Sequence, residues 1–163
     1  MDGRRQTGLR SWVSNQRLLV TGAGGSIGSE LCRQIAAACP KRLIAIDHNV
    51  NTLYNMKTKL QRDFPGIAVN AFVADSTDKK AMTQLLQYQN VSLVLHAAAY
   101  KHLPLMEQDP IAAVTNNVLG THRMLKIAHD LQIPRFVLIS SDKAVYPSSI
   151  MGATKRLGEL LIS

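Results

Sequence analysis

The stretch Val20-Thr21-Gly22-Ala23-Gly24-Gly25-Ser26-Ile27-Gly28 decides the fold. A short apolar run precedes it, and a segment with helical periodicity, Ser29 to Ala38, follows it, which is typical of a dinucleotide-binding turn. Gly22 lets the strand turn sharply, Gly25 lets a pyrophosphate approach the backbone, and Gly28 lets the helix pack closely. The phosphates would lie at the helix N-terminus, where free N–H groups and the helix dipole favour anions. The alternative is a glycine turn that binds no ligand.

An acidic residue at a suitable distance supports the first interpretation. Asp47 ends a second apolar run, residues 43–46, and lies about 20 residues beyond Gly28. A carboxylate at this position accepts hydrogen bonds from the adenosine ribose and repels a 2′-phosphate, so the sequence predicts NAD and not NADP. His48 and Asn49 follow it, so no Arg is present there to bind a phosphate. The alternative role for Asp47 is a cap on the next helix.

The rest of the chain alternates short apolar runs with segments of helical periodicity. The predicted strands cover residues 17–20, 42–46, 67–74, 91–96 and 135–140. The predicted helices cover residues 29–38, 51–64, 78–89 and 111–131, with a last helix from about 151 onward. Apolar strands that alternate with helices predict an α/β fold, a doubly wound parallel sheet of the Rossmann type with helices on both faces.

Ligands in such folds bind outside the carboxyl ends of the strands. Asp75, after the third strand, is suited to hold an adenine through its side chain or neighbouring amides. The run Ala97–Ala99 lets a cofactor lie close to the backbone, although close packing alone would also explain it. His102 is a candidate base or a surface residue. The predicted cofactor-binding residues at these strand ends are Gly22, Gly25, Ser26, Ile27, Gly28, Asp47, Asp75, Ser76, Ala97, Ala98 and Ala99.

Length and composition fit one compact domain. The 163 residues are 46% apolar and 18% charged, which is typical of a globular chain. No apolar run approaches the ~20 residues of a membrane span, and Met1 to Arg10 lacks the apolar stretch of a secretory signal. Cys32 and Cys39 both fall on the first predicted helix, too far apart for a disulfide while that helix is intact. Reduced thiols and a cytoplasmic location are therefore expected.

The formal net charge of +8 is concentrated near the N-terminus, where Arg4, Arg5, Arg10 and Arg17 lie close together. We expect a basic arm at residues 1–15 that is a solvated tail, with binding to an anionic membrane surface or a nucleic acid as the alternative. The later basic residues are scattered among few aromatics, so no nucleic-acid partner is predicted. A dinucleotide-binding domain is expected at residues 16–163, and no metal site is predicted.

Further motifs lie near the C-terminus. Ser140-Ser141-Asp142-Lys143-Ala144-Val145-Tyr146-Pro147 is followed by Met151-Gly152-Ala153-Thr154-Lys155. Together with Thr-Gly-Ala-Gly-Gly-Ser-Ile-Gly-Ser-Glu at 21–30, Ala-Ala-Ala-Tyr-Lys-His at 97–102 and Asn-Val-Leu-Gly-Thr at 117–121, this resembles the extended short-chain dehydrogenase/reductases. Within them the chain is similar to the nucleotide-sugar 4,6-dehydratases of bacterial polysaccharide synthesis, the CapD-like group. The resemblance covers roughly residues 16–163.

The resemblance implies a reaction and a role for three residues. The substrate is UDP-N-acetylglucosamine or a close relative: NAD takes hydride from sugar C4, water leaves across C5–C6, and the hydride returns to C6. By position, Asp142 is the acid that protonates the departing C6 hydroxyl and Lys143 is the base at C5. Lys155 holds the nicotinamide ribose. The alternative for Asp142 and Lys143 is an ion pair on a surface loop.

Two positions depart from the commoner family pattern. Most of the superfamily has a catalytic Tyr where this chain has Met151, which cannot accept a proton. The longer, membrane-anchored dehydratases also have Met there, and in these a hydroxyl residue, usually Thr, helps to position the C4 hydroxyl. Ser141 would take that place here. Tyr146 replaces a usual Asn, and no catalytic role is predicted for it.

The resemblance also implies what lies outside this chain. Family members continue well beyond Lys155 with a domain that binds the sugar and the uridine diphosphate, so we expect a cofactor-binding part with little turnover alone. The predicted partner is a UDP-sugar, and assembly into a homo-oligomer is left open. A nucleotide-sugar epimerase is the alternative enzyme, although it normally has Tyr at position 151. A nucleotide-binding module without turnover is the alternative from another class.

Overall fold

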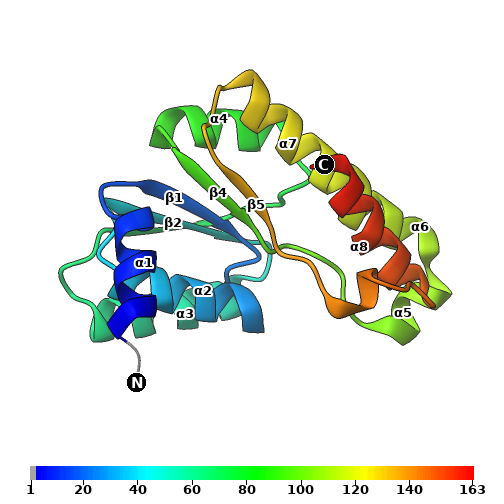
Figure 1. Cartoon of the computed structure of the whole chain (residues 1–163), viewed down its shortest axis with the longest axis horizontal. Coiled ribbons are helices and arrows are strands. Elements are labelled where there is room, and N and C mark those ends of the chain that lie inside the picture. Colours follow the sequence, from blue (N-terminus) through cyan, green and yellow to red (C-terminus); the bar gives the residue numbers. More distant parts are fainter. Residues whose placement is uncertain (1–2) are drawn as a thin grey trace.

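One parallel sheet organises the chain. The computed structural model describes the backbone of residues 3–163 and the side chains from Gly8 onward. Five strands pair in the order β3-β2-β1-β4-β5, all parallel (Figure 1). They are β1 (Arg17–Thr21), β2 (Arg42–Asp47), β3 (Val69–Val73), β4 (Leu93–His96) and β5 (Phe136–Leu138). The strand order reverses at β1, which creates the crevice where ligands bind in this architecture. The predicted fold class is confirmed.

Helices lie on both faces of this sheet. They are α1 (Gly3–Val13), α2 (Ser26–Ala37), α3 (Val50–Asp63), α4 (Lys79–Gln89), α5 (Leu103–Gln108), α6 (Pro110–Ala113), α7 (Gly120–Asp130) and α8 (Ile150–Leu161), with a π turn η1 (Val114–Leu119) and a 3₁₀ turn η2 (Asp142–Ala144). Helices α2 and α3 cover one face, whereas α4 and α7 cover the other (Figure 1). Among residues 3–163, no helix is long and apolar enough to cross a membrane.

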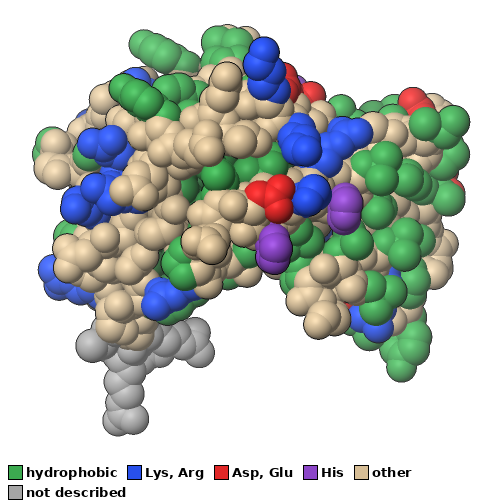
Figure 2. Space-filling view, turned by 90° about the horizontal axis from the view of Figure 1, so that it is seen from above, with side chains coloured by type: hydrophobic (Ala, Val, Ile, Leu, Met, Phe, Trp, Pro, Cys, Tyr) green, Lys and Arg blue, Asp and Glu red, His purple; other side chains and the backbone are tan. Residues whose placement is uncertain are grey.

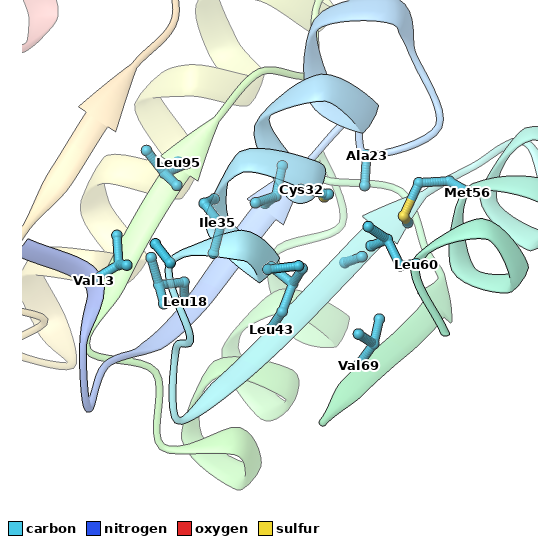
Figure 3. Packing of buried hydrophobic residues seen from close by; sticks show 14 of the residues in the cluster. Val13, Leu18, Ala23, Cys32, Ile35, Leu43, Met56, Leu60, Val69 and Leu95 are labelled. Carbon is cyan, nitrogen blue, oxygen red and sulfur yellow. The ribbon is translucent and has the colours of Figure 1, made fainter. Parts of the chain in front are cut away.

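Alternating side chains of the central strand feed two hydrophobic clusters. Leu18 belongs to the cluster under α2 and α3, where it lies with Leu43 of β2 and Ile35 of α2 (Figure 3). Leu19 points to the other face and joins the cluster under α4 and α7, with Met124. Burial of one such side chain stabilises the fold by roughly 1.5–3 kcal/mol. The sheet therefore has a dry core on both faces, which holds its carboxyl edge in place.

The long helix predicted at 111–131 is present and runs without a break through α6, the π turn η1 and α7, and a further helix, α5, precedes it. Asn117 is buried within η1. Its side chain bonds the backbone of Tyr100 and the hydroxyl of Thr154, contacts that a regular apolar helix would not make. A widened turn of this kind often marks a functional position.

The expectation of a solvated N-terminal tail is wrong for the end of that segment. Residues 3–13 form the helix α1, and Met1 and Asp2 lie outside the described residues. Val13 is fully buried in the cluster under α2 and α3. The Arg135 guanidinium lies 5.8 Å from the ring centre of Trp12 and donates a hydrogen bond to the Trp12 carbonyl. A cation–π contact and core packing thus attach this segment to the sheet.

Basic side chains lie at several places on the face that Figure 2 shows. Lys and Arg stand there among polar and hydrophobic side chains, with several gathered near the upper middle of the view. The same view shows hydrophobic side chains gathered over the part of the molecule that Figure 1 labels α5, α6 and α8.

Cys32 is buried, and burial raises the pKa of its thiol to about 12. Cys39 lies beyond the end of α2 and not on it, with a φ of 57°; both thiols are free.

Candidate functional site

The glycine turn after β1 is held by close backbone contacts. Gly22 has a φ of +64°, and a Cβ placed on it would lie 2.8 Å from the Cα of Ala98. A Cβ on Gly28 would overlap the carbonyl oxygen of Gly22 and lie 2.9 Å from the Cα of Ala23. Both positions therefore exclude any side chain. The turn fits tightly between the first turn of α2 and the segment that follows β4.

The N-terminus of α2 is open toward an anion. Gly25 is the N-cap residue and supplies no side-chain hydrogen bond, and the first turn contains no acidic residue. Added to Gly25, a Cβ would meet only the Gly22 carbonyl oxygen, at 3.3 Å. Across the turn, the Lys101 amine lies 3.4 Å from the Ser26 hydroxyl. Uncapped N–H groups, the positive helix end and a nearby ammonium group together favour a bound phosphate.

Asp47 connects the glycine turn to the start of α3. Its carboxylate is nearly buried, and each oxygen accepts a backbone N–H at 2.9 Å, one from Gly24 and one from Asn49. The cap of α3 is Asn49, whose side chain accepts from the N–H of Thr52. Asp47 is therefore not the helix cap. Each of its oxygens keeps a lone pair, which suits the two hydroxyls of a ribose.

A single cavity joins these elements to the C-terminal motifs. It has a volume of about 740 Å³ and opens at the carboxyl ends of the strands. Every site residue predicted from the sequence lines it: Gly22, Gly25, Ser26, Ile27, Gly28, Asp47, Asp75, Ser76, Ala97, Ala98, Ala99, Ser141, Asp142, Lys143, Met151 and Lys155. Tyr100, Lys101 and His102 also line this cavity. Segments that lie far apart in the sequence thus form one site of the size usual for a small-molecule ligand.

The Ser141–Lys143 segment forms the exposed part of this site. The Ser141 hydroxyl caps η2, accepting the N–H of Lys143 at 3.2 Å, and donates to the Asp142 carboxylate at 3.0 Å. The Lys143 amine lies 3.6 Å from the same carboxylate, whose side chain is 88% exposed. The Ser141 hydrogen bond and the Lys143 charge lower the pKa of Asp142. In this arrangement the two groups form an ion pair at the cavity rim.

Two residues of α8 line the inner wall of the cavity. Met151 is buried with Met106 and Ala113, so position 151 presents an apolar thioether where a proton acceptor would otherwise stand. The Lys155 amine donates to the Ile139 carbonyl at 2.5 Å. Burial lowers the pKa of Lys155, and the charge of Glu159 opposes that effect. Lys155 is thus a half-buried cation beside the end of β5.

Sequence reasoning did not find the pair formed by Thr21 and His96. The Thr21 hydroxyl accepts the N–H groups of Ala97 and Ala98, both at 3.1 Å, which leaves its proton for the Nδ1 of His96 at 2.7 Å. The Nε2 of His96 has no partner among the described residues. Burial, with the charge of Lys155, lowers the pKa of His96 to about 3, so the ring is neutral. A histidine that ends an apolar strand was the available signal.

Asn117 belongs to the motif at residues 117–121, but the sequence analysis predicted no contact for it. Its side chain accepts the Tyr100 N–H at 2.8 Å, and donates to the Tyr100 carbonyl and to the Thr154 hydroxyl, both at 3.0 Å. It therefore connects the segment after β4 to α8. A polar residue inside an otherwise apolar helical pattern was the signal for it.

The strand order, the glycine turn beside its reversal point and the cavity there define a Rossmann-type α/β domain. Residues 18–163 match the family described as polysaccharide biosynthesis protein, and the chain belongs to that family. It is 46% identical over 151 residues to the probable polysaccharide biosynthesis protein EpsC of Bacillus subtilis (strain 168). It is 42% identical over 151 residues to the capsular polysaccharide biosynthesis protein CapD of Staphylococcus aureus. The resemblance to the CapD-like group is thereby confirmed.

These relatives are much longer than the chain. Each alignment covers 92% of this chain and 25% of the relative, so the chain spans about a quarter of their length. Among solved structures, UDP-glucose-4-epimerase from Stenotrophomonas maltophila, with bound NAD and formylated UDP-arabinopyranose, is similar with a TM-score of 0.82 at 25% identity. That similarity covers 90% of this chain and 47% of the epimerase.

Proposed function

We propose that this chain is the cofactor-binding part of an NAD-dependent nucleotide-sugar 4,6-dehydratase of surface polysaccharide biosynthesis. Its substrate is of the UDP-N-acetylglucosamine type. The observation that carries the proposal is the single cavity in which the glycine turn and Asp47 face the Asp142–Lys143 pair and Lys155. The EpsC and CapD relatives support the biological process, and the UDP-sugar bound to the similar epimerase supports the substrate class.

The residues around the glycine turn fit NAD. The uncapped N-terminus of α2 and the Lys101 amine suit the pyrophosphate, and Gly25 leaves room for it. The lone pairs left on Asp47 suit the adenosine ribose, and its negative charge disfavours the 2′-phosphate of NADP. When bound, NAD supplies the group that takes and returns a hydride. Lys155 lies beside the end of β5, where it would hold the nicotinamide ribose.

The Asp142–Lys143 pair would carry out the elimination. For the elimination, the proton of the ion pair passes from Lys143 to Asp142. The neutral Lys143 amine then removes the proton at sugar C5, while Asp142 gives its proton to the C6 hydroxyl, which leaves as water. An acid in this role needs a raised pKa, whereas that of Asp142 is lowered by the Ser141 hydroxyl and the Lys143 charge. A sugar bound between the two groups would shield the carboxylate from water and separate it from the amine, and both changes raise its pKa.

Position 151 decides how the sugar C4 hydroxyl is held. Met151 cannot take its proton, and its buried thioether only closes the apolar side of the cavity. Ser141 is a hydroxyl residue at the rim of the same cavity, next to Asp142. We infer that Ser141 positions the C4 hydroxyl, as the Met-type members of the resembled group imply. Ser141 would then exchange its contact with Asp142 for one with the sugar.

A test in two stages decides between this function and its alternatives. NAD titration of the purified chain comes first, and binding that is tighter than NADP binding is expected. Incubation with UDP-N-acetylglucosamine and NAD then separates the enzymes by their products. A 4-keto-6-deoxy sugar supports the dehydratase, and a 4-epimer supports the epimerase represented by the similar structure. NAD binding without either product, also when the chain is extended by the corresponding C-terminal part of the Bacillus relative, supports a non-catalytic module.

The surroundings of the protein follow from the same proposal. A nucleotide-sugar substrate and two free thiols, Cys32 and Cys39, agree with a reducing, cytoplasmic location. Proximity to the membrane surface and assembly into a homo-oligomer both stay predictions.

A further inference from the structure

One face of α8 contacts the segment that follows β5 at three places. A Cβ on Gly152 would lie 2.5 Å from the carbonyl oxygen of Lys143, so the helix backbone lies directly against η2. Lys155 donates to the Ile139 carbonyl, and the Glu159 carboxylate accepts from the Ser140 hydroxyl. Residues 152, 155 and 159 recur at helical spacing and share this face. The helix thus holds the segment both before and after Ser141.

The contact between Glu159 and Ser140 is short and charged. The hydroxyl oxygen lies 2.6 Å from Oε1 of Glu159, a distance typical of a hydrogen bond to an ionised carboxylate. The other oxygen, Oε2, accepts from the Arg156 guanidinium at 2.9 Å. The Arg156 side chain is 50% exposed, so its ion pair is of the weak surface kind. The two contacts use different oxygens of one carboxylate and can be removed separately.

Residues 140–144 form the reactive loop of the proposed function. Contacts within this loop do not by themselves fix its position over the sheet. Within the loop, Ser141 bonds Asp142 and the N–H of Lys143, which fixes the shape of η2 but not its position over the sheet.

The preceding strand, β5, has three residues, and all of them are only partly buried. The Ile139 N–H bonds to the His96 carbonyl of β4, and Ala144 is buried; further contacts that position the loop come from α8. The Ser140 hydroxyl lies at the point where the loop leaves the strand.

We propose that Glu159 is a positioning residue, whose carboxylate holds the Ser140 hydroxyl and thereby places Asp142 and Lys143 at the rim of the cavity. The inference rests on the proposed function, because it is in that reaction that Asp142 and Lys143 act. Glu159 does not line the cavity, whereas Ser140 does, so Glu159 acts through Ser140. Burial lowers the pKa of the neighbouring Lys155, and the negative charge of Glu159 opposes this decrease.

Amide hydrogen exchange of the unliganded chain tests the inference. The reporters are the N–H groups of Lys143 and Ala144, which bond to Ser141. Glu159→Ala and Ser140→Ala are each expected to speed their exchange about tenfold, and the double variant no further, because the two side chains form one contact. Exchange in β1 and β4 should not change, which separates a local effect from loss of the fold.

Two further variants complete the design. Arg156→Ala removes only the ion pair on the other oxygen, so it should leave exchange of the loop unchanged. Glu159→Gln keeps an oxygen that can accept from Ser140 and should restore most of the protection that Glu159→Ala removes. Equal effects of Arg156→Ala and Glu159→Ala, or additive effects of Ser140→Ala and Glu159→Ala, would overturn the inference.

The hydrogen-exchange result can be interpreted whether or not the proposed function is correct. If the chain fails to bind NAD, the proposed function fails, yet protection of the loop still reports on Glu159. If NAD binds but protection of the loop ignores Glu159, the inference fails and the proposed function stands.

Discussion

The two sides of the cavity are built differently. On the side of β1 and β2, strand residues are buried almost without interruption, and the glycine turn is fixed by backbone atoms that touch each other. On the side of β5 and α8, the strand is only partly buried, and the third hydrophobic cluster has just three buried residues, Met106, Ala113 and Met151. There, side-chain hydrogen bonds such as Ser140 to Glu159 hold the chain. The β1–β2 side of the cavity, which we propose binds NAD and call the binding side, is held by packing. The β5–α8 side, which we propose contacts the sugar and call the chemical side, is held largely by polar contacts that a substrate could exchange in that reaction.

The largest expected effect concerns the close packing of the glycine turn. Gly28→Ala should lower the free energy of unfolding by about 4 kcal/mol or prevent folding, because the added methyl overlaps the Gly22 carbonyl oxygen and crowds Ala23. Neither neighbour is a flexible side chain that could move away. Urea denaturation followed by circular dichroism measures the change.

The matched control adds the same methyl group three residues earlier. Gly25→Ala should lower the free energy of unfolding by only about 1 kcal/mol, since the methyl meets a single oxygen at 3.3 Å. It should nevertheless weaken NAD binding at least tenfold, because it fills the space proposed for the pyrophosphate. Normal NAD affinity in folded Gly25→Ala would show that the phosphates lie elsewhere.

The second effect concerns His96, at the junction of the two sides. The folded ring is neutral with a pKa of about 3, whereas the unfolded ring takes a proton near 6.5. Its contribution to stability is therefore complete above pH 6.5 and is lost as the pH falls toward 3. Between pH 7.5 and 5 the free energy of unfolding should drop by about 2 kcal/mol on account of this residue.

The variant His96→Asn isolates that contribution. Its side-chain oxygen can accept from the Thr21 hydroxyl in place of Nδ1 but does not titrate. Urea denaturation at the two pH values should show a smaller drop for His96→Asn than for the unmutated chain. An equal drop in the free energy of unfolding for both proteins would mean that His96 takes up its proton in the folded state at an ordinary pKa.

The third effect concerns Asp47 and applies to the binding side alone. The unmutated chain should bind NAD more tightly than NADP, and Asp47→Asn should narrow that preference by about tenfold, because the negative charge facing a 2′-phosphate is removed. Asn keeps one side-chain oxygen, so one of the two N–H groups of Gly24 and Asn49 retains its acceptor, whereas Ala would remove both acceptors. Calorimetric titration with both cofactors provides the measurement. Equal affinities in the unmutated chain would contradict the assignment.

What the sequence predicts follows the same division. The glycine turn and Asp47 could be recognised because a strand, a turn and a helix in succession specify their geometry locally. The contacts of Asn117 in the π turn could not, because they join it to Tyr100 and to Thr154, which are distant in the sequence. The contact of Trp12 with Arg135 could not be predicted either, because 123 positions separate the two residues.

At the loop of residues 141–143, the sequence identified the residues and offered an exposed ion pair as one of two interpretations. The family motif indicated Asp142 and Lys143, and both line the cavity. The pKa of Asp142 is lowered by its sequence neighbours Ser141 and Lys143. The motif does not encode how the loop packs against α8 through Gly152 and Glu159. Local pattern therefore predicted the residues and their nearest contacts, whereas non-local contacts determine where the loop lies.

The smallest expected effect concerns that pair. Asp142→Asn should leave the urea midpoint of the chain unchanged within measurement error, because the ion pair with Lys143 spans 3.6 Å between exposed side chains. The Asn oxygen can still accept from the Ser141 hydroxyl, so η2 keeps its cap and its shape. Raising the salt concentration should likewise have no differential effect on the two proteins. A clear loss of stability would show that the pair supports the fold, and the contrast between a packed binding side and an exchangeable chemical side would then be wrong at its central residue.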